Sequence, residues 1–287
     1  MSAEISAASE KRGWLRAPSA KTLITAFITL ILVLGEWRYG ITGGYDKLAL
    51  TLGTCVVTEA VLAFFVLGKW PRLQSAYITG TSLSLLLRPA GGLLWPYVMA
   101  AVLSIMAKYV LRYRGKHLWN PSNLGLALMV LLAPSQVALL SHELGNDVFT
   151  NVVIWIVGLM VASRAKVLHI TVTYAVSFAL LALLRSAIVG TPALAELAPL
   201  TGPMYQLLCF FMLTDPPTTG GTLRGRVIVT ILIALVECLF RLANDFEWPL
   251  AEIVAPAPPI IALFFVAPVA FAWDLKRRAQ REGSAGA

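Results

Sequence analysis

The feature that most constrains this chain is a succession of apolar segments separated by short loops. Of its 287 residues, 58% are hydrophobic and only 13% are charged, which is far from the composition of a water-soluble globule. A helix needs about 20 apolar residues to cross the hydrocarbon core of a bilayer. The sequence therefore predicts an all-α integral membrane protein whose main contact is the lipid bilayer.

Ten segments are apolar enough to be interpreted as transmembrane helices. They cover residues 22–35, 48–68, 74–87, 93–111, 123–140, 150–162, 168–188, 203–213, 227–240 and 253–273. Grouped in fives, they predict a cytoplasmic amino-terminal tail over 1–20, a first repeat over 21–140, a second repeat over 141–274 and a basic cytoplasmic tail over 275–287.

The positions of lysine and arginine give an independent check on this count, because cytoplasmic loops carry an excess of both. With the amino terminus inside, the loops on the opposite side keep only Arg38, Lys47, Arg88, Arg185 and Arg241 of the 23 basic residues. The net charge of +8 is then explained by membrane topology, and nucleic-acid binding is not predicted. We expect a multi-pass protein of the cell inner (plasma) membrane with both termini in the cytoplasm.

Cysteine and histidine are too few and too scattered for metal redox chemistry. The chain has only Cys55, Cys209, Cys238, His117, His142 and His169. The cysteines lie singly in apolar runs, and the histidines lie near segment ends. This pattern predicts no iron–sulfur cluster, no haem and no metal site.

Two of the ten segments are short and run directly into proline and glycine. Segment 74–87 is followed by Arg88-Pro89, and segment 203–213 by Thr214-Asp215-Pro216-Pro217. Each is third in its group of five, and five crossings place the start of the second group on the other side of the membrane. The pattern predicts two inverted five-helix repeats with broken third and eighth helices and a binding site at their interface. Ordinary interfacial turns beside short spans are the alternative.

Three ionisable residues fall inside predicted spans, where each costs about 2.5–3.5 kcal/mol on insertion scales. They are Glu59, Lys108 and Glu237. Lys108 is predicted to pair with Glu237 or Glu59, and the two glutamates are candidates for an ion path. Alternatively, Lys108 extends to the cytoplasmic interface, and Glu59 is a neutral carboxyl group in a polar gap.

The loop before the fifth segment carries a helix-start motif. Asn120-Pro121 followed by Ser122 and Asn123 offers an N-cap and free amide donors beside Lys116 and His117. Helix amino termini bind anions, so the motif predicts an anion or phosphate site. A simple capped helix start is the alternative.

Several of these motifs together resemble one membrane family. They are Thr79-Gly80, Arg88-Pro89, Lys108, Trp119-Asn120-Pro121-Ser122, FFMLTDPPT over residues 210–218, and Arg224-Gly225-Arg226. The set is similar to the RnfD/NqrB family, whose members belong to Rnf electron-transport complexes and to the sodium-pumping Nqr NADH:quinone oxidoreductase. The most specific piece is FFMLTDPPT, which resembles the family's FFMATDPVT.

The resemblance implies ten helices in two inverted halves, a flavin between them, and electron transfer within a multisubunit complex that moves Na⁺ or H⁺. The Ser/Thr-Gly-Ala-Thr sequence that carries covalent FMN in Rnf and Nqr members is absent here. The chain is in this respect more similar to the short UnbU-type relatives. The resemblance therefore implies non-covalent FMN or riboflavin, or a quinone, held by Thr79, Arg88, Lys108, Asn120, Thr214 and Asp215.

Three functions are compatible with these patterns. The first is a membrane subunit of an electron-transport complex, with other membrane or redox subunits as partners and at most an electron-transfer role as an enzyme. The second is a small-solute channel or transporter, because inverted repeats with broken helices also build such proteins. The third is a cofactor-free scaffold or accessory subunit of a larger membrane complex.

Overall fold

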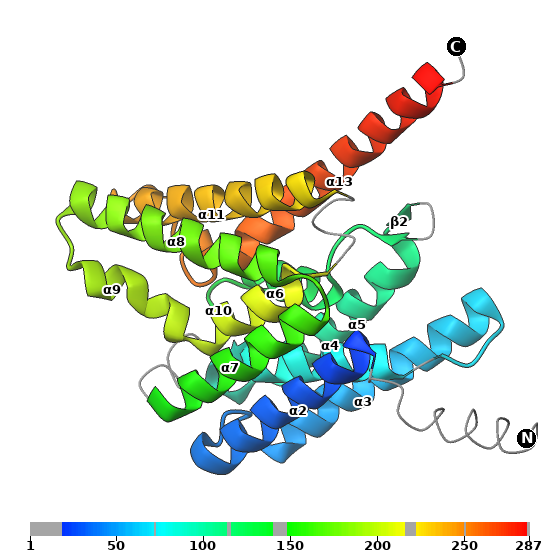
Figure 1. Cartoon of the computed structure of the whole chain (residues 1–287). Helices are drawn as coiled ribbons and strands as arrows, with labels where there is room; N and C mark the ends of the chain where they lie inside the picture. Colours follow the sequence, from blue (N-terminus) through cyan, green and yellow to red (C-terminus); the bar gives the residue numbers. More distant parts are fainter. Residues whose placement is uncertain are drawn as a thin grey trace, which may run out of the picture.

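The computed structural model describes residues 19–71, 73–113, 116–139, 148–215, 222–249 and 251–285. This part of the chain is almost entirely helical, with two pairs of very short strands (Figure 1). The expected all-α class is therefore confirmed for the described residues.

The described residues of the first half form five α-helices. They are α2 (Ala20–Tyr39), α3 (Tyr45–Leu62), α4 (Gln74–Leu86), α5 (Trp95–Val110) and α6 (Pro121–Leu132). The π-helix η2 (Ala63–Leu67) extends α3, and a 3-10 turn, η3 (Ala90–Gly92), precedes α5. Strand β1 (Leu87–Pro89) pairs antiparallel with β4 (Val137–Leu139), and β2 (Arg112–Tyr113) pairs with β3 (Lys116–His117).

The second half is more interrupted. Its elements are α7 (Val148–Arg164), α8 (Leu168–Val189), α9 (Ala193–Leu197), η4 (Ala198–Thr201), α10 (Pro203–Leu207), the π-helix η5 (Leu208–Met212), α11 (Leu223–Asp245), α12 (Ala251–Val254) and α13 (Pro258–Ala285). In Figure 1, α8 and α11 lie together on one side of the molecule and α2 and α3 on the other, with α4, α6 and α10 between them.

Local sequence explains where several helices begin and end. Ser19 caps α2 by accepting the amide of Thr22, and Gly40 ends that helix with φ +58, a left-handed conformation that glycine adopts readily. Asn120 caps α6 through the amide of Asn123, and Pro121 occupies the first helical position, where a missing amide proton costs nothing.

Four described segments are long and apolar enough to cross a membrane. They are Tyr45–Leu67, Leu168–Val189, Leu223–Asp245 and Pro258–Lys276. Only 22% of the apolar window is buried inside the protein in each of the first two. Their outward surface is therefore apolar, which suits lipid and not water. These helices indicate a membrane protein.

Helices α4 and α6 are short and central. With 13 and 12 residues they span only about 18–20 Å, less than a bilayer core. Most of their residues are buried, and so are Leu87, Val137 and Leu139 of the β1–β4 pair that follows them. Irregular backbone at this depth is tolerated because protein surrounds it and satisfies its polar groups.

Two predicted helix ranges are interrupted in the structure, each beside a proline: Pro134 in the first and Pro256 in the second. The segment predicted over 123–140 leaves the helix at Leu132, because Pro134 disfavours helical geometry at Ala133, whose φ is −137. The segment predicted over 253–273 is divided: α12 ends at Val254, and α13 begins only at Pro258. The short elements α9 and η4 were not predicted.

One close helix contact allows α5 and α6 to pack. At Gly125 of α6, an added Cβ would meet the Oγ of Ser104 and lie 2.8 Å from the carbonyl oxygen of Ala100, both on α5. Real Cβ atoms essentially never approach backbone so closely, so the two helices would have to separate. Gly125 is needed for this packing.

We therefore expect Gly125→Ala to lower the free energy of unfolding by about 1–3 kcal/mol, as overpacked cores do. Gly53→Ala is the matched control, because nothing lies within 4 Å of the added Cβ on α3. That change should be neutral or stabilise by up to about 1 kcal/mol. Chemical unfolding in detergent micelles measures both, and equal effects would contradict the packing argument.

Candidate functional site

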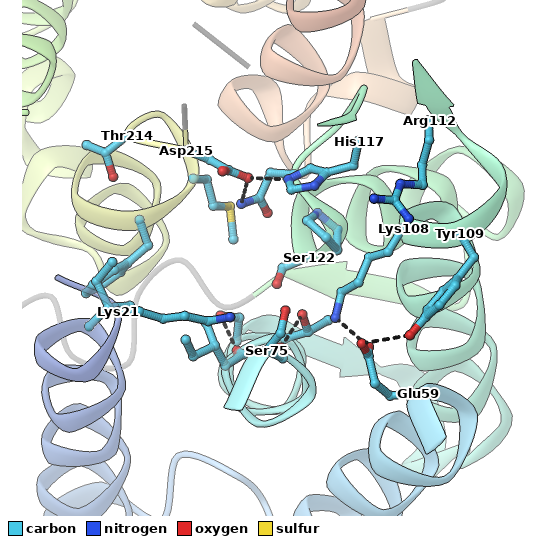
Figure 2. Close-up of a pocket in the computed structure, with 18 of the residues that line it drawn as sticks. Lys21, Glu59, Ser75, Lys108, Tyr109, Arg112, His117, Ser122, Thr214 and Asp215 are labelled. Atoms are coloured by element: carbon cyan, nitrogen blue, oxygen red, sulfur yellow. Dashed lines mark hydrogen bonds and ion pairs between the residues drawn. The ribbon is translucent and has the colours of Figure 1, made fainter. Parts of the chain in front are cut away.

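A cavity of about 490 Å³ opens between the ends of several helices and is the candidate site (Figure 2). Its walls come from α2, α3, η2, α4, α5, β2, β3, α6 and η5, so both halves of the sequence contribute. Among the predicted site residues, Glu59, Thr79, Lys108, Asn120, Thr214 and Asp215 all line it. Arg88 and Glu237 do not.

An ion pair between α3 and α5 forms one wall. The ammonium of Lys108 donates to Glu59 at 2.8 Å, and the hydroxyl of Tyr109 donates to the other carboxylate oxygen at 3.1 Å. Both charged side chains are about nine-tenths buried, at 11% and 9% exposure. Of the two partners expected for Lys108, Glu59 is the one that the structure provides.

A second polar cluster joins two of the motifs that carry the family resemblance. Asp215, which follows η5, accepts from the amide of Asn120 at 3.1 Å and lies 3.1 Å from Nε2 of His117. Asn120 itself caps α6, so one side chain both starts that helix and holds the carboxylate. The described part of the FFMLTDPPT stretch, which ends at Asp215, and the Trp119–Asn123 motif therefore meet at the cavity.

The start of α6 is also fixed to α13. Asn123 donates to the carbonyl of Ile260 at 2.9 Å, and the indole of Trp119 donates to the carbonyl of Phe264 at 2.8 Å. These two bonds hold the amino-terminal turns of the helices side by side. The cavity wall at Asn120 consequently depends on both halves.

The two predicted threonines present acceptors to the cavity. Thr79 donates its hydroxyl to the carbonyl of Ser75 at 3.0 Å, and Thr214 donates to that of Phe210 at 2.8 Å. Because each proton is used within its own helix, the oxygen lone pairs remain for a ligand donor.

The electrostatic balance of the wall is positive. Its basic residues are Lys21, Lys108 and Arg112, and its acidic residues are Glu59 and Asp215. Apolar side chains such as Leu67, Ile78 and Phe211 complete the lining. Lys21, Tyr109 and Arg112 were not predicted as site residues, since the sequence assigns them only to the basic interface or to ordinary span ends.

Arg88 lies elsewhere, at the carboxyl end of α4. Its guanidinium donates to the carbonyls of Ser84 at 3.0 Å and Leu87 at 2.7 Å, and to that of Ile41 in the loop after α2. Buried carbonyls that lose their helical partners need donors of this kind. Arg88 therefore provides hydrogen-bond donors for carbonyls at the point where α4 ends.

Glu237 is fully buried in a separate cluster within the second half. Tyr174, Tyr205 and Arg241 all donate to its carboxylate, the last at 3.0 Å from Nε. A neighbouring cluster joins Arg185 of α8 to Glu196 and Asp245, each at 2.6 Å. Glu59 and Glu237 therefore do not face a common cavity in the described part of the chain.

The sequence contained one signal for the Glu237 cluster. Arg241 stands four positions after Glu237, which places both on one face of α11. Nothing in the sequence pointed to the two tyrosines, because they come from α8 and α10. Among the described residues, no three histidine, cysteine, aspartate or glutamate side chains form a group that could hold a metal ion.

The fold and the cavity define a class: a helical membrane protein with an amphipathic, net-basic cavity between the ends of its helices. A scan against protein-family models and a search of curated proteins both find no match to the chain. The family resemblance of the motifs therefore stays a prediction.

We expect Lys108→Met to lower the free energy of unfolding by about 3 kcal/mol, because it leaves a buried carboxylate without its cation. The double variant Glu59→Gln/Lys108→Met should lose clearly less than the sum of the two single changes. Unfolding in mixed micelles measures the three values. Strict additivity would show that the pair contributes no coupling.

Proposed function

We propose that this protein is a multi-pass membrane subunit of an electron-transport complex, and that it holds a non-covalent flavin or a quinone in the cavity. The observation that carries the proposal is convergence: five of the six cofactor contacts that the family resemblance implies line one cavity, and only Arg88 lies outside it. Pockets of 300–1,000 Å³ with apolar walls and a few placed polar groups are typical small-molecule sites.

The donor set of the cavity fits such a cofactor. A flavin or quinone ring has apolar faces and an edge of hydrogen-bonding groups. The lining offers Phe211 and Ile78 as apolar surface, Lys108 and Asn120 as donors, and Thr79 as an acceptor. A bound flavin would supply the redox chemistry, while these residues would bind and orient it and favour a reduced, anionic ring through positive charge.

Helix contacts support the proposed inverted repeat. In the first half α3 packs against α4 and α5, and α5 packs against α6. In the second half α8 packs against η5 and α11, and α11 packs against α13. Corresponding helices in the two halves thus have corresponding neighbours, and the third element of each half is interrupted. Two related halves would give this pattern. Ten crossings in total, with broken third and eighth helices, follow from this proposal.

The ends of the molecule at which β2, α9 and the carboxyl terminus of α13 lie support the proposed topology. In Figure 1, the β2 strand and the carboxyl-terminal part of α13 lie at the same end of the molecule, while α9 lies at the other. Under the predicted orientation the first end is cytoplasmic. We propose the inner (plasma) membrane as the location and other membrane or redox subunits as partners.

The test is the visible absorption of the detergent-purified chain, followed by acid precipitation and flavin fluorescence of both fractions. We expect about one flavin per chain, released into the supernatant because no covalent bond holds it. Organic extraction and chromatography detect a quinone in the same preparation.

Two threonine variants show whether the cavity holds the cofactor. Thr79→Val removes an acceptor in the cavity and should weaken cofactor binding roughly tenfold in Kd. Thr54→Val is the matched control, because Thr54 makes the same type of bond, to the carbonyl of Leu50 at 2.7 Å, but does not line the cavity. Equal loss in both variants would argue against the assigned site.

A preparation with no flavin and no quinone would overturn the proposal for this chain. Solute flux in liposomes would then favour a channel or transporter, although Glu59 and Glu237 belong to separate clusters. Stoichiometric partner subunits without a cofactor would favour a scaffold.

A further inference from the structure

One basic side chain in the cavity has no partner among the residues that the structure describes. Lys21, in the first turn of α2, lines the cavity and makes no side-chain hydrogen bond or ion pair with any described residue. Figure 2 shows Lys21 and Lys108 reaching into the cavity from opposite sides, above the start of α4. Lys108 is neutralised by Glu59, so Lys21 leaves positive charge facing this space.

A buried donor faces the same space without a partner. Ser122, the second residue of α6, is only 5% exposed and lines the cavity, yet its hydroxyl bonds to no described residue. Figure 2 shows that hydroxyl pointing into the cavity. Because this hydroxyl faces the cavity and is not used by the described residues, it can donate to a ligand atom placed there.

The backbone of α6 adds a further donor. The first amides of a helix have no acceptor within it. Pro121 has no amide proton, and the amide of Asn123 is satisfied by the side chain of Asn120, so that of Ser122 is the one left open in this turn. The 12-residue helix also places its positive dipole end here.

We propose that Lys21, Lys108 and Ser122 form a subsite for a phosphate group, whose ligand extends its apolar part along Ile24 and Phe211. Two ammonium groups and a hydroxyl approach from different directions, which suits the several oxygens of a phosphate better than a planar carboxylate. The inference deepens the proposed function: if a flavin is bound, it is FMN and not riboflavin.

Two sources could supply this chemistry, the phosphate of FMN and the headgroup of an anionic phospholipid. The first test titrates the full-length, detergent-purified chain with FMN and with riboflavin and follows fluorescence quenching. We expect FMN to bind at least about tenfold more tightly, since the two ligands differ only in the phosphate. Lys21→Gln should bring the ratio close to one, and Lys21→Arg should preserve it.

Two further variants separate a local effect from a general one. Lys69→Gln, an exposed lysine outside the cavity, should leave the ratio unchanged. Ser122→Ala should reduce the ratio by about threefold through the loss of one donor. Lys21 is exposed at a helix end, so its replacement should not impair folding, which circular dichroism verifies.

The second test asks whether phosphatidylglycerol or phosphatidylcholine is retained by native mass spectrometry and competes with the flavins. Selective retention of phosphatidylglycerol that is lost in Lys21→Gln supports the subsite with a lipid as its source, even if no flavin binds and the proposed function fails. Equal binding of FMN and riboflavin, together with no lipid selectivity, overturns the subsite while leaving a riboflavin or quinone site intact.

Discussion

The fold depends on one constraint: backbone amides and carbonyls deep in a membrane protein must find partners within the protein. The chain leaves helical geometry after α4 and after α6, and it does so where other elements can compensate. The segments that follow α4 and α6 pair with each other as β1 and β4, and this pairing gives their backbone groups hydrogen-bond partners. Arg88 covers carbonyls at the end of α4, and Asn123 reaches across to the carbonyl of Ile260 on α13.

The cavity is a result of these interruptions. A continuous helix would present its ends only at the membrane surface, whereas α6 begins and η5 ends against each other inside the protein. Their caps and carboxylates then face a shared space, and Asp215 can contact both His117 and Asn120.

Many of the helix ranges could be predicted from the apolar runs and from the proline and glycine residues that flank them. Segments 74–87, 168–188 and 203–213 match their helices within a residue, since apolar runs and flanking proline or glycine define them. The side-chain destinations of Arg88 and Lys21 could not be predicted. Both lie near helix ends, and the direction of a long basic side chain depends on which carbonyls, carboxylates or open space its neighbours provide. That information belongs to tertiary packing.

The buried carboxylates of α3 and α11, Glu59 and Glu237, are neutralised at different stages of synthesis. Glu237 and Arg241 lie one turn apart on α11, so that helix can enter the membrane with its charge already neutralised. Glu59 must pair with Lys108, which lies 49 positions later on another helix. As the chain leaves the ribosome, α3 therefore carries an unpaired carboxyl group until α5 arrives, and the first half has reason to assemble as a unit before it is released into lipid.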